Sequence, residues 1–153
     1  MAKNVAEQLV DTLEKAGVKR IYAVTGDSLN EVNEAVRKSG KIKWIHVRHE
    51  ETGAFAAASE AQLNGELACC AGSSGPGHVH LINGLYDAQR SGAPVLAIAS
   101  TLPTHEFGTE YFQETNTIKL FEDCSYYNQV ATTPEQFPRM LQGAIQAALS
   151  FRG

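Results

Sequence analysis

The chain has 153 residues, of which 43% are hydrophobic and 20% charged, enough for one domain with a hydrophobic core. Its formal net charge is -4 and the charges are scattered without a basic patch, so the sequence does not indicate a nucleic-acid partner. The longest apolar run, Pro94–Ala99, is far too short to cross a bilayer, and the N-terminus has no apolar signal region. The three cysteines form no disulfide framework, which favours a reducing, cytoplasmic location.

The first half of the chain alternates helical periodicity with short β-type runs. Val5, Leu9 and Leu13 fall at helical spacing, and Gly17 is the expected end of that first helix. The following elements are a strand over 20–24, a helix from 29 to about 40, a strand over 42–47, an alanine-rich helix over 50–64 and a strand over 67–71.

The second half continues this alternation after a sharp break at residues 73–77. The predicted elements are a helix over about 78–90, a strand over 94–99, a short helix over 118–121, a strand over 125–131 and a final helix that starts at 133. Residues 101–117 lack periodicity and predict a long loop. Loops of that length are often functional.

Strands that alternate with helices predict an α/β fold, a three-layer α/β/α arrangement around a mainly parallel sheet of five strands. The strand at 67–71 is apolar on both faces, as an interior parallel strand should be. The chain stops at Phe151–Gly153, straight after a helix, where an alternating fold would supply another strand. We therefore expect residues 1–153 to be one domain cut from a longer polypeptide.

Ligands of open parallel sheets bind at the carboxyl ends of the strands. Four segments follow strands there: Thr25–Ser28, Arg48–Glu51, Gly72–Gly77 and the loop from Ser100. Glu50 follows a strand and opens a helix, where the helix dipole favours an anion. From position alone, a simple N-terminal acid is the preferred interpretation of Glu50.

The other candidate residues have equally plain structural interpretations. Gly72–Gly77 could cradle an anion, but it lacks the P-loop ending, and a tight turn is about as probable. Adjacent Cys69 and Cys70 are interpreted as buried core residues. His78 and His80 should diverge on a helix, so no metal site is predicted. His49, beside Glu50, is expected to have a hydrogen-bonded positioning role.

The joint order of these motifs resembles the pyrimidine-binding domain of thiamine-diphosphate enzymes, most closely the pyruvate oxidase and acetolactate synthase group. The motifs are Thr25–Asn30, Arg48–Glu51, Gly75–Gly77, Pro94–Ile98 and Tyr111–Glu114. In this family the strand order is 2-1-3-4-6-5, so the resemblance implies that the sixth strand is missing by truncation.

Two further stretches, His78–Tyr86 and Phe121–Tyr126, resemble the bacterial pyruvate dehydrogenases that reduce quinone, which are also called pyruvate oxidases. One departure from many relatives is His80, which stands three residues after Gly77 where they carry Asn. Some quinone-linked members share this histidine, which favours that branch.

The resemblance implies a role for each site residue. Glu50 would be the catalytic residue: its carboxylate would hydrogen-bond the aminopyrimidine of thiamine diphosphate, favour the imino tautomer and so activate the cofactor. Phe112 and Gln113 would face the substrate. The implied cofactor-binding residues are Gly26, Asp27, Glu50, Ser74, Gly75, Pro76 and Gly77.

The resemblance also implies parts that lie outside this chain. The family binds the diphosphate through Mg²⁺ with a Gly-Asp-Gly motif, which this sequence lacks, and the quinone-linked branch has an FAD-binding middle domain. The whole enzyme would oxidise pyruvate to acetate and CO2 and pass electrons to ubiquinone. It would be a dimer-based homo-oligomer, expected as a tetramer, held peripherally on the inner face of the membrane through a C-terminal region.

Two alternatives stay open. The parent enzyme could be a phosphate-dependent pyruvate oxidase or an acetolactate synthase, because the residues that separate these activities lie mostly in other domains. In a different class, the chain could be a non-catalytic α/β module that binds a ligand. The abrupt end after a helix argues against the second alternative.

Overall fold

The computed structural model describes residues 3–153 and has a parallel sheet at its centre. Within these residues the sheet has four strands in the order β2-β1-β3-β4, all parallel. The strands are β1 (Arg20–Ala23), β2 (Lys43–His46), β3 (Ala68–Gly72) and β4 (Val95–Ala99). β3 is buried along its whole length, which confirms its interpretation as an interior strand.

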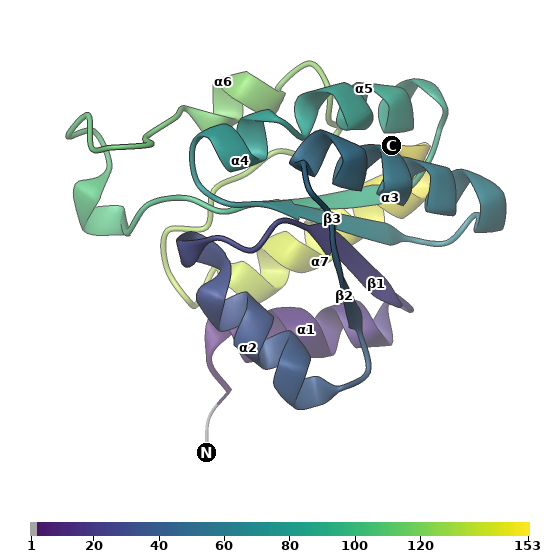
Figure 1. Cartoon of the computed structure of the whole chain (residues 1–153), viewed down its shortest axis with the longest axis horizontal. Helices are drawn as coiled ribbons and strands as arrows, with labels where there is room; N and C mark the ends of the chain where they lie inside the picture. Colours follow the sequence, from purple (N-terminus) through teal and green to yellow (C-terminus); the bar gives the residue numbers. More distant parts are fainter. Residues whose placement is uncertain (1–2) are drawn as a thin grey trace.

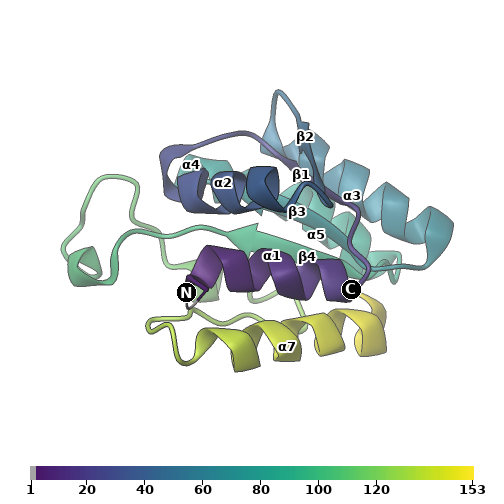
Figure 2. The same cartoon turned by 90° about the horizontal axis from the view of Figure 1, so that it is seen from below.

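Helices cover both faces of the sheet (Figures 1 and 2). One face carries α1 (Val5–Lys15), α2 (Asn30–Ser39) and α7 (Phe137–Ala147). The other carries α3 (Glu50–Asn64), α4 (Pro76–Val79), α5 (Ile82–Arg90) and α6 (Thr117–Phe121). Single turns complete the chain: η1 (Asp27–Leu29), η2 (Thr104–Glu106) and η3 (Ala148–Arg152). The predicted α/β/α class is confirmed.

Each face of the sheet has its own hydrophobic core, because side chains alternate along a strand. Cys69 packs among α1, α2 and α7, while its neighbour Cys70 packs among α3 and α5. The second core is built largely from alanines of α3. Gly84 of α5 lies so close to α3 that an added Cβ would be 2.4 Å from Cβ of Ala54. This close contact holds α5, and the turn before it, firmly against α3.

The predicted fifth strand over 125–131 is wrong: these residues form no strand. Side chains hold the segment to helices instead of to the edge of β4. The Nδ2 of Asn128 donates to the Ile118 carbonyl of α6 at 2.7 Å, and the Tyr127 ring lies against Gly143 of α7. A groove of about 570 Å³ separates the segment from β4, so neither backbone supplies a ladder partner to the other.

Two helix predictions also need correction. The single helix expected over 78–90 is broken into α4 and α5, because the Leu81 amide bonds the His78 carbonyl three residues back and interrupts the α-helical ladder. The last helix begins at Phe137 instead of 133. His80 is the last residue before the break and keeps its helical bond to the Pro76 carbonyl.

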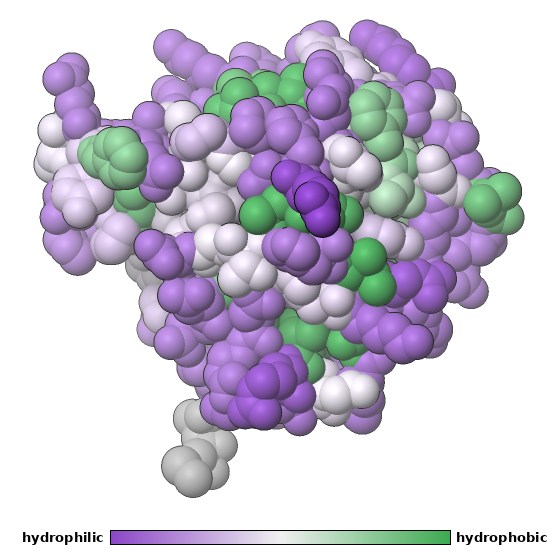
Figure 3. All heavy atoms as spheres, in the orientation of Figure 1, coloured by the Kyte–Doolittle hydropathy of each residue, from purple (hydrophilic) through white to green (hydrophobic). Residues whose placement is uncertain are grey.

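The described residues contain no helix that is both long enough and apolar enough to span a membrane. On the face seen in Figure 3, apolar side chains lie in small separate groups among hydrophilic ones.

Candidate functional site

The carboxyl ends of β1, β2 and β3 bring three of the predicted segments together. Hydroxyl groups tie two of these segments to each other. Ser28, after β1, lies 2.8 Å from Ser73, after β3, measured between the Oγ atoms. The Oγ of Ser28 also accepts the amide of Ser74 at 2.9 Å, and its carbonyl accepts the Oγ–H of Ser100, after β4, at 2.8 Å. The strand ends therefore form one connected surface.

Two glycines let these segments approach more closely than other residues would. A Cβ on Gly26 would lie 2.4 Å from the Oγ of Ser73, inside van der Waals contact. A Cβ on Gly77 would lie 3.3 Å from Oε1 of Glu50 and 3.2 Å from Cβ of Ser73. The Gly77 backbone consequently lies directly against the Glu50 carboxylate, with no side chain between them.

Glu50 is the first residue of α3 and is only 9% exposed, which is unusual for an acid. Its Oε2 lies 3.1 Å from Nδ1 of His80, while its Oε1 lies beside Gly77. Within residues 3–153, no hydrogen bond to Oε1 is formed. Burial and a dedicated partner argue against the simple N-terminal acid that position alone favoured.

The neighbouring Glu51 has a different environment, as expected from the turn of the helix. Its Oε1 accepts a hydrogen bond of 2.6 Å from Nδ2 of Asn83 on α5, and its side chain is 38% exposed. The two adjacent acids therefore point to different partners, and only Glu50 faces the glycine turn.

His80 is the site residue whose contact with Glu50 sequence reasoning missed. From the end of α4 its ring reaches Glu50, and the ring stacks on His49 with centroids 4.3 Å apart. His49, Glu50 and His80 each place a ligand-type atom within 4.8 Å of the others, close enough to hold a metal ion. The absence of a metal site in this chain stays a prediction.

His78 diverges from His80, as predicted, and its role is structural. The Nδ1–H of His78 donates to the Ser100 carbonyl at 2.8 Å, so its Nε2 accepts from the Oγ1–H of Thr115. Burial lowers the pKa of His78, and the Ser100 carbonyl offsets part of that decrease. This histidine connects the turn after β3 to the long loop after β4.

The long loop after β4 carries the two residues predicted to face the substrate. Phe112 is 78% exposed, while Gln113 has a positive φ of 68° and lies against Gly75. A Cβ on Gly75 would lie 2.7 Å from Cβ of Gln113, and Gly75 itself has a φ of 69°. The loop therefore touches the glycine turn through Gln113 and presents Phe112 to solvent.

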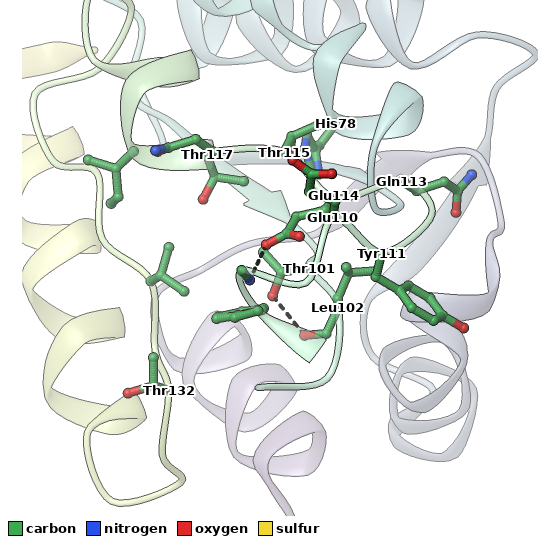
Figure 4. A pocket seen from close by; sticks show the side chains of 15 residues that line it. His78, Thr101, Leu102, Glu110, Tyr111, Gln113, Glu114, Thr115, Thr117 and Thr132 are labelled. Atoms are coloured by element: carbon green, nitrogen blue, oxygen red, sulfur yellow. Dashed lines mark hydrogen bonds between the residues drawn. The ribbon is translucent and has the colours of Figure 1, made fainter. Parts of the chain in front are cut away.

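A pocket of about 660 Å³ lies under this loop (Figure 4). Gln113 and His78 line it, together with Thr101, Tyr111 and Thr115, but Glu50 does not. This pocket is therefore distinct from the Glu50 surface, although Gln113 connects its lining to the turn at Gly75. We place the candidate site at Glu50 because this buried carboxylate is a group that can exchange a proton with a ligand.

The structure brings together most of the predicted cofactor-binding residues. Gly77 lies against Glu50, Gly26 lies against Ser73, Ser74 bonds Ser28, and Gly75 contacts Gln113. Asp27 and Pro76 are exposed at the rim, and Phe112 projects away from the chain. Cofactor binding by these residues stays a prediction.

The fold and the strand-end site together define a family. The sequence model of the family described as thiamine pyrophosphate enzyme, N-terminal TPP binding domain, matches residues 3–120. The chain belongs to this family.

Three relatives show where the chain stands within it. It is 57% identical over 149 residues to a protein of Pseudomonas amyloderamosa described as an uncharacterized 42.6 kDa protein in isoamylase 3'region, covering 97% of this chain and 38% of that protein. It is 43% identical over 152 residues to the putative thiamine pyrophosphate-containing protein YdaP of Bacillus subtilis, covering 99% and 26%. It is 38% identical over 146 residues to the pyruvate oxidase of Lactiplantibacillus plantarum, covering 95% and 24%.

The chain thus spans 24–38% of the length of these relatives.

Proposed function

We propose that this chain is the N-terminal, pyrimidine-facing domain of a thiamine-diphosphate- and FAD-dependent pyruvate dehydrogenase that reduces quinone. The whole enzyme would convert pyruvate and water to acetate and CO2, with two electrons and two protons passing to the quinone. The observation that carries the proposal is the buried Glu50 carboxylate, with Oε1 against the Gly77 turn. Similarity to the pyruvate oxidase of Lactiplantibacillus plantarum supports pyruvate as substrate.

In this proposal an aminopyrimidine ring binds beside Glu50. Gly77 brings backbone without a side chain against Oε1 of Glu50, which leaves that carboxylate oxygen to a flat heterocycle. A carboxylate with one unbonded oxygen can share a proton with a ring nitrogen. Serines 28, 73 and 74 hold the backbone of this wall in place.

Each residue has a defined task in this proposal. When bound, thiamine diphosphate supplies the electron sink for decarboxylation of the 2-keto acid. Glu50 accepts or returns a proton at the pyrimidine nitrogen, and its burial keeps water from competing for that hydrogen bond. Gln113, which contacts Gly75, and Phe112 would face the substrate.

Further components belong to the proposed whole enzyme. Mg²⁺ would bind the diphosphate through oxygen ligands of another domain, and FAD would occupy a middle domain. A homo-oligomer, with a dimer as its unit and expected as a tetramer, would place this wall opposite a partner subunit's half of the site. Quinone and membrane contact would likewise lie outside residues 1–153, on a protein held peripherally at the inner face of the membrane.

Calorimetry of the isolated chain tests whether it is one wall of a shared site. One hydrogen bond to a charged group contributes about 1.5–3 kcal/mol, less than the roughly 4–15 kcal/mol of lost freedom on binding. We therefore expect no binding of thiamine diphosphate tighter than about millimolar with Mg²⁺ present. Micromolar binding, or pyruvate decarboxylation by the chain alone, would contradict the shared site.

The complete polypeptide tests the reaction itself. We expect pyruvate-dependent reduction of a quinone analogue that does not require phosphate. Strict dependence on phosphate would identify a phosphate-dependent pyruvate oxidase, and acetolactate production without acceptor reduction would identify an acetolactate synthase. A ligand-binding module would show none of these activities, even with both cofactors supplied.

A further inference from the structure

The two oxygens of the Glu50 carboxylate have separate environments. Oε2 lies 3.1 Å from Nδ1 of His80, and Oε1 faces the backbone at Gly77. An ionised carboxylate is only an acceptor, so with Glu50 ionised the contact places a proton on Nδ1 of His80. The histidine must then be either cationic or in the Nδ1–H form, the less common neutral tautomer.

The His80 ring is held by more than this contact. His49, which directly precedes Glu50, stacks on it with an interplanar angle of 26°. The amide of His80 bonds the Pro76 carbonyl at 3.2 Å, and the next residue, Leu81, is fully buried. Backbone, stacking partner and carboxylate together fix the ring although its side chain is 41% exposed.

We propose that His80 is a positioning residue for Glu50. Its Nδ1–H holds Oε2, which prevents the carboxylate from rotating and keeps Oε1 directed at the Gly77 turn. The consequence for activity rests on the proposed function, in which Oε1 meets the aminopyrimidine. The tautomer and the hydrogen bond do not rest on it, because they are properties of this chain alone.

The proposal distinguishes substitutions by where they place a donor. In His, Nδ1 is attached to Cγ, and in Asn, Nδ2 is attached to Cγ, so His80→Asn keeps an N–H at the same distance from the backbone. His80→Gln moves the amide one carbon further, and His80→Leu removes the donor. Asn at position 80 should therefore preserve the hydrogen bond to Oε2 of Glu50, whereas Gln or Leu at this position should not. A merely space-filling role would predict the opposite order, because Leu and Gln are closer to His in size.

The first experiment is imidazole ¹⁵N NMR of the chain at about pH 8, where a free imidazole is neutral. The chain has five histidines, and the signals lost in His80→Asn identify this residue. We expect the Nδ1–H tautomer for His80, converting largely to Nε2–H in Glu50→Ala. The matched control Glu51→Ala should leave the tautomer unchanged, since Glu51 bonds Asn83.

The His78 signals report whether each variant is folded, because its two hydrogen bonds to Ser100 and Thr115 require the native loop. An Nε2–H tautomer for His80 in the unmodified chain would overturn the proposal without any variant. An equal change in Glu50→Ala and Glu51→Ala, with His78 unchanged, would also overturn it.

The second experiment measures C2–H exchange of bound thiamine diphosphate in the complete enzyme. His80→Leu and His80→Gln should slow the exchange by about tenfold or more, the lower end of what a hydrogen bond to a charged group is worth, and His80→Asn by less than about threefold. Equal losses in all three would overturn the positioning role. If the tautomer is Nδ1–H but the complete enzyme shows no exchange at all, the proposed function fails while the His80–Glu50 contact stands.

Discussion

The two sides of the sheet's carboxyl edge are built differently. Behind β1, β2 and β3, short turns pack so tightly that Gly26 and Gly72 leave no room for a Cβ, and the buried Glu50 lies against Gly77. Behind β4, a long loop has positive φ angles at Glu110 and Gln113, covers a pocket and exposes Phe112. Contacts within the chain therefore fix the turns after β1, β2 and β3, which we call the closed side. The loop after β4, the open side, leaves Phe112 exposed to solvent.

The largest expected effect tests how tightly the closed side is packed. In Gly72→Ala, the new Cβ would lie 2.6 Å from the Gly77 carbonyl oxygen and from Cα of His78, and neither backbone atom can rotate away. We expect a loss of about 3 kcal/mol in the free energy of unfolding, measured in urea. Phe112→Ala, on the open side, should change it by less than about 0.5 kcal/mol. Similar losses in both variants would show that the two sides do not differ in packing.

A smaller effect should appear when pH falls, through the histidine that joins the two sides. The pKa of His78 in the folded chain is lowered, chiefly by burial, below the unfolded value of about 6.5. Folding stability from the neutral ring is therefore complete above about pH 6.5 and is lost as the pH falls below it. Carboxylates such as Glu34, whose pKa is lowered to about 2, act only at more acidic pH.

Thermal unfolding between pH 7 and pH 5 checks this expectation. The melting temperature should fall in the unmodified chain and fall less in His78→Asn, which keeps a donor for the Ser100 carbonyl and cannot be protonated. If the melting temperature of His78→Asn fell as much between pH 7 and pH 5 as that of the unmodified chain, protonation of His78 would not be the cause of the acid destabilisation.

The smallest expected effect is a difference in reactivity between the cysteines of the two hydrophobic cores and the cysteine that lines the groove beside β4. Burial raises the pKa of Cys70 to about 12 and that of Cys69 well above its usual value. Burial also raises the pKa of Cys124, but this residue lines the groove beside β4. Cys124 should therefore react first with a thiol reagent in the folded chain. Reaction of Cys69 or Cys70 at the same rate would mean that the core opens as readily as the groove.

Much of the fold could be predicted from local patterns. The alanine-rich helix was placed at 50–64, where α3 lies, and the four strands that form were placed within about two residues, because apolar periodicity and capping glycines are local signals. The strand order of the first four strands also agrees with the family order. Glu50, the residue to which the resemblance assigns the catalytic role, is buried, as a dedicated site residue should be.

The misses depend on contacts between distant residues. Residues 125–131 have a strand-like composition, but Asn128 and Tyr127 attach them to helices, and no local pattern encodes that choice. The His80–Glu50 contact joins residues 30 positions apart, at the end of α4 and the start of α3, and no local pattern encodes it. The signal that could have found it was the histidine that replaces the more common asparagine, since both side chains carry a donor on Cγ.

The central claim is that Glu50 on the closed side activates the cofactor. The most direct test is the C2–H exchange rate of bound thiamine diphosphate in the complete enzyme, with Glu50→Gln set against Glu51→Gln. Gln keeps the shape of the side chain but loses the ionisable carboxylate, so we expect Glu50→Gln to slow exchange by about 10²–10⁴-fold while cofactor affinity stays largely intact. Glu51→Gln should change the rate by only a few-fold, because its partner is Asn83. Comparable losses in both variants, or a larger loss in Glu51→Gln, would contradict the claim.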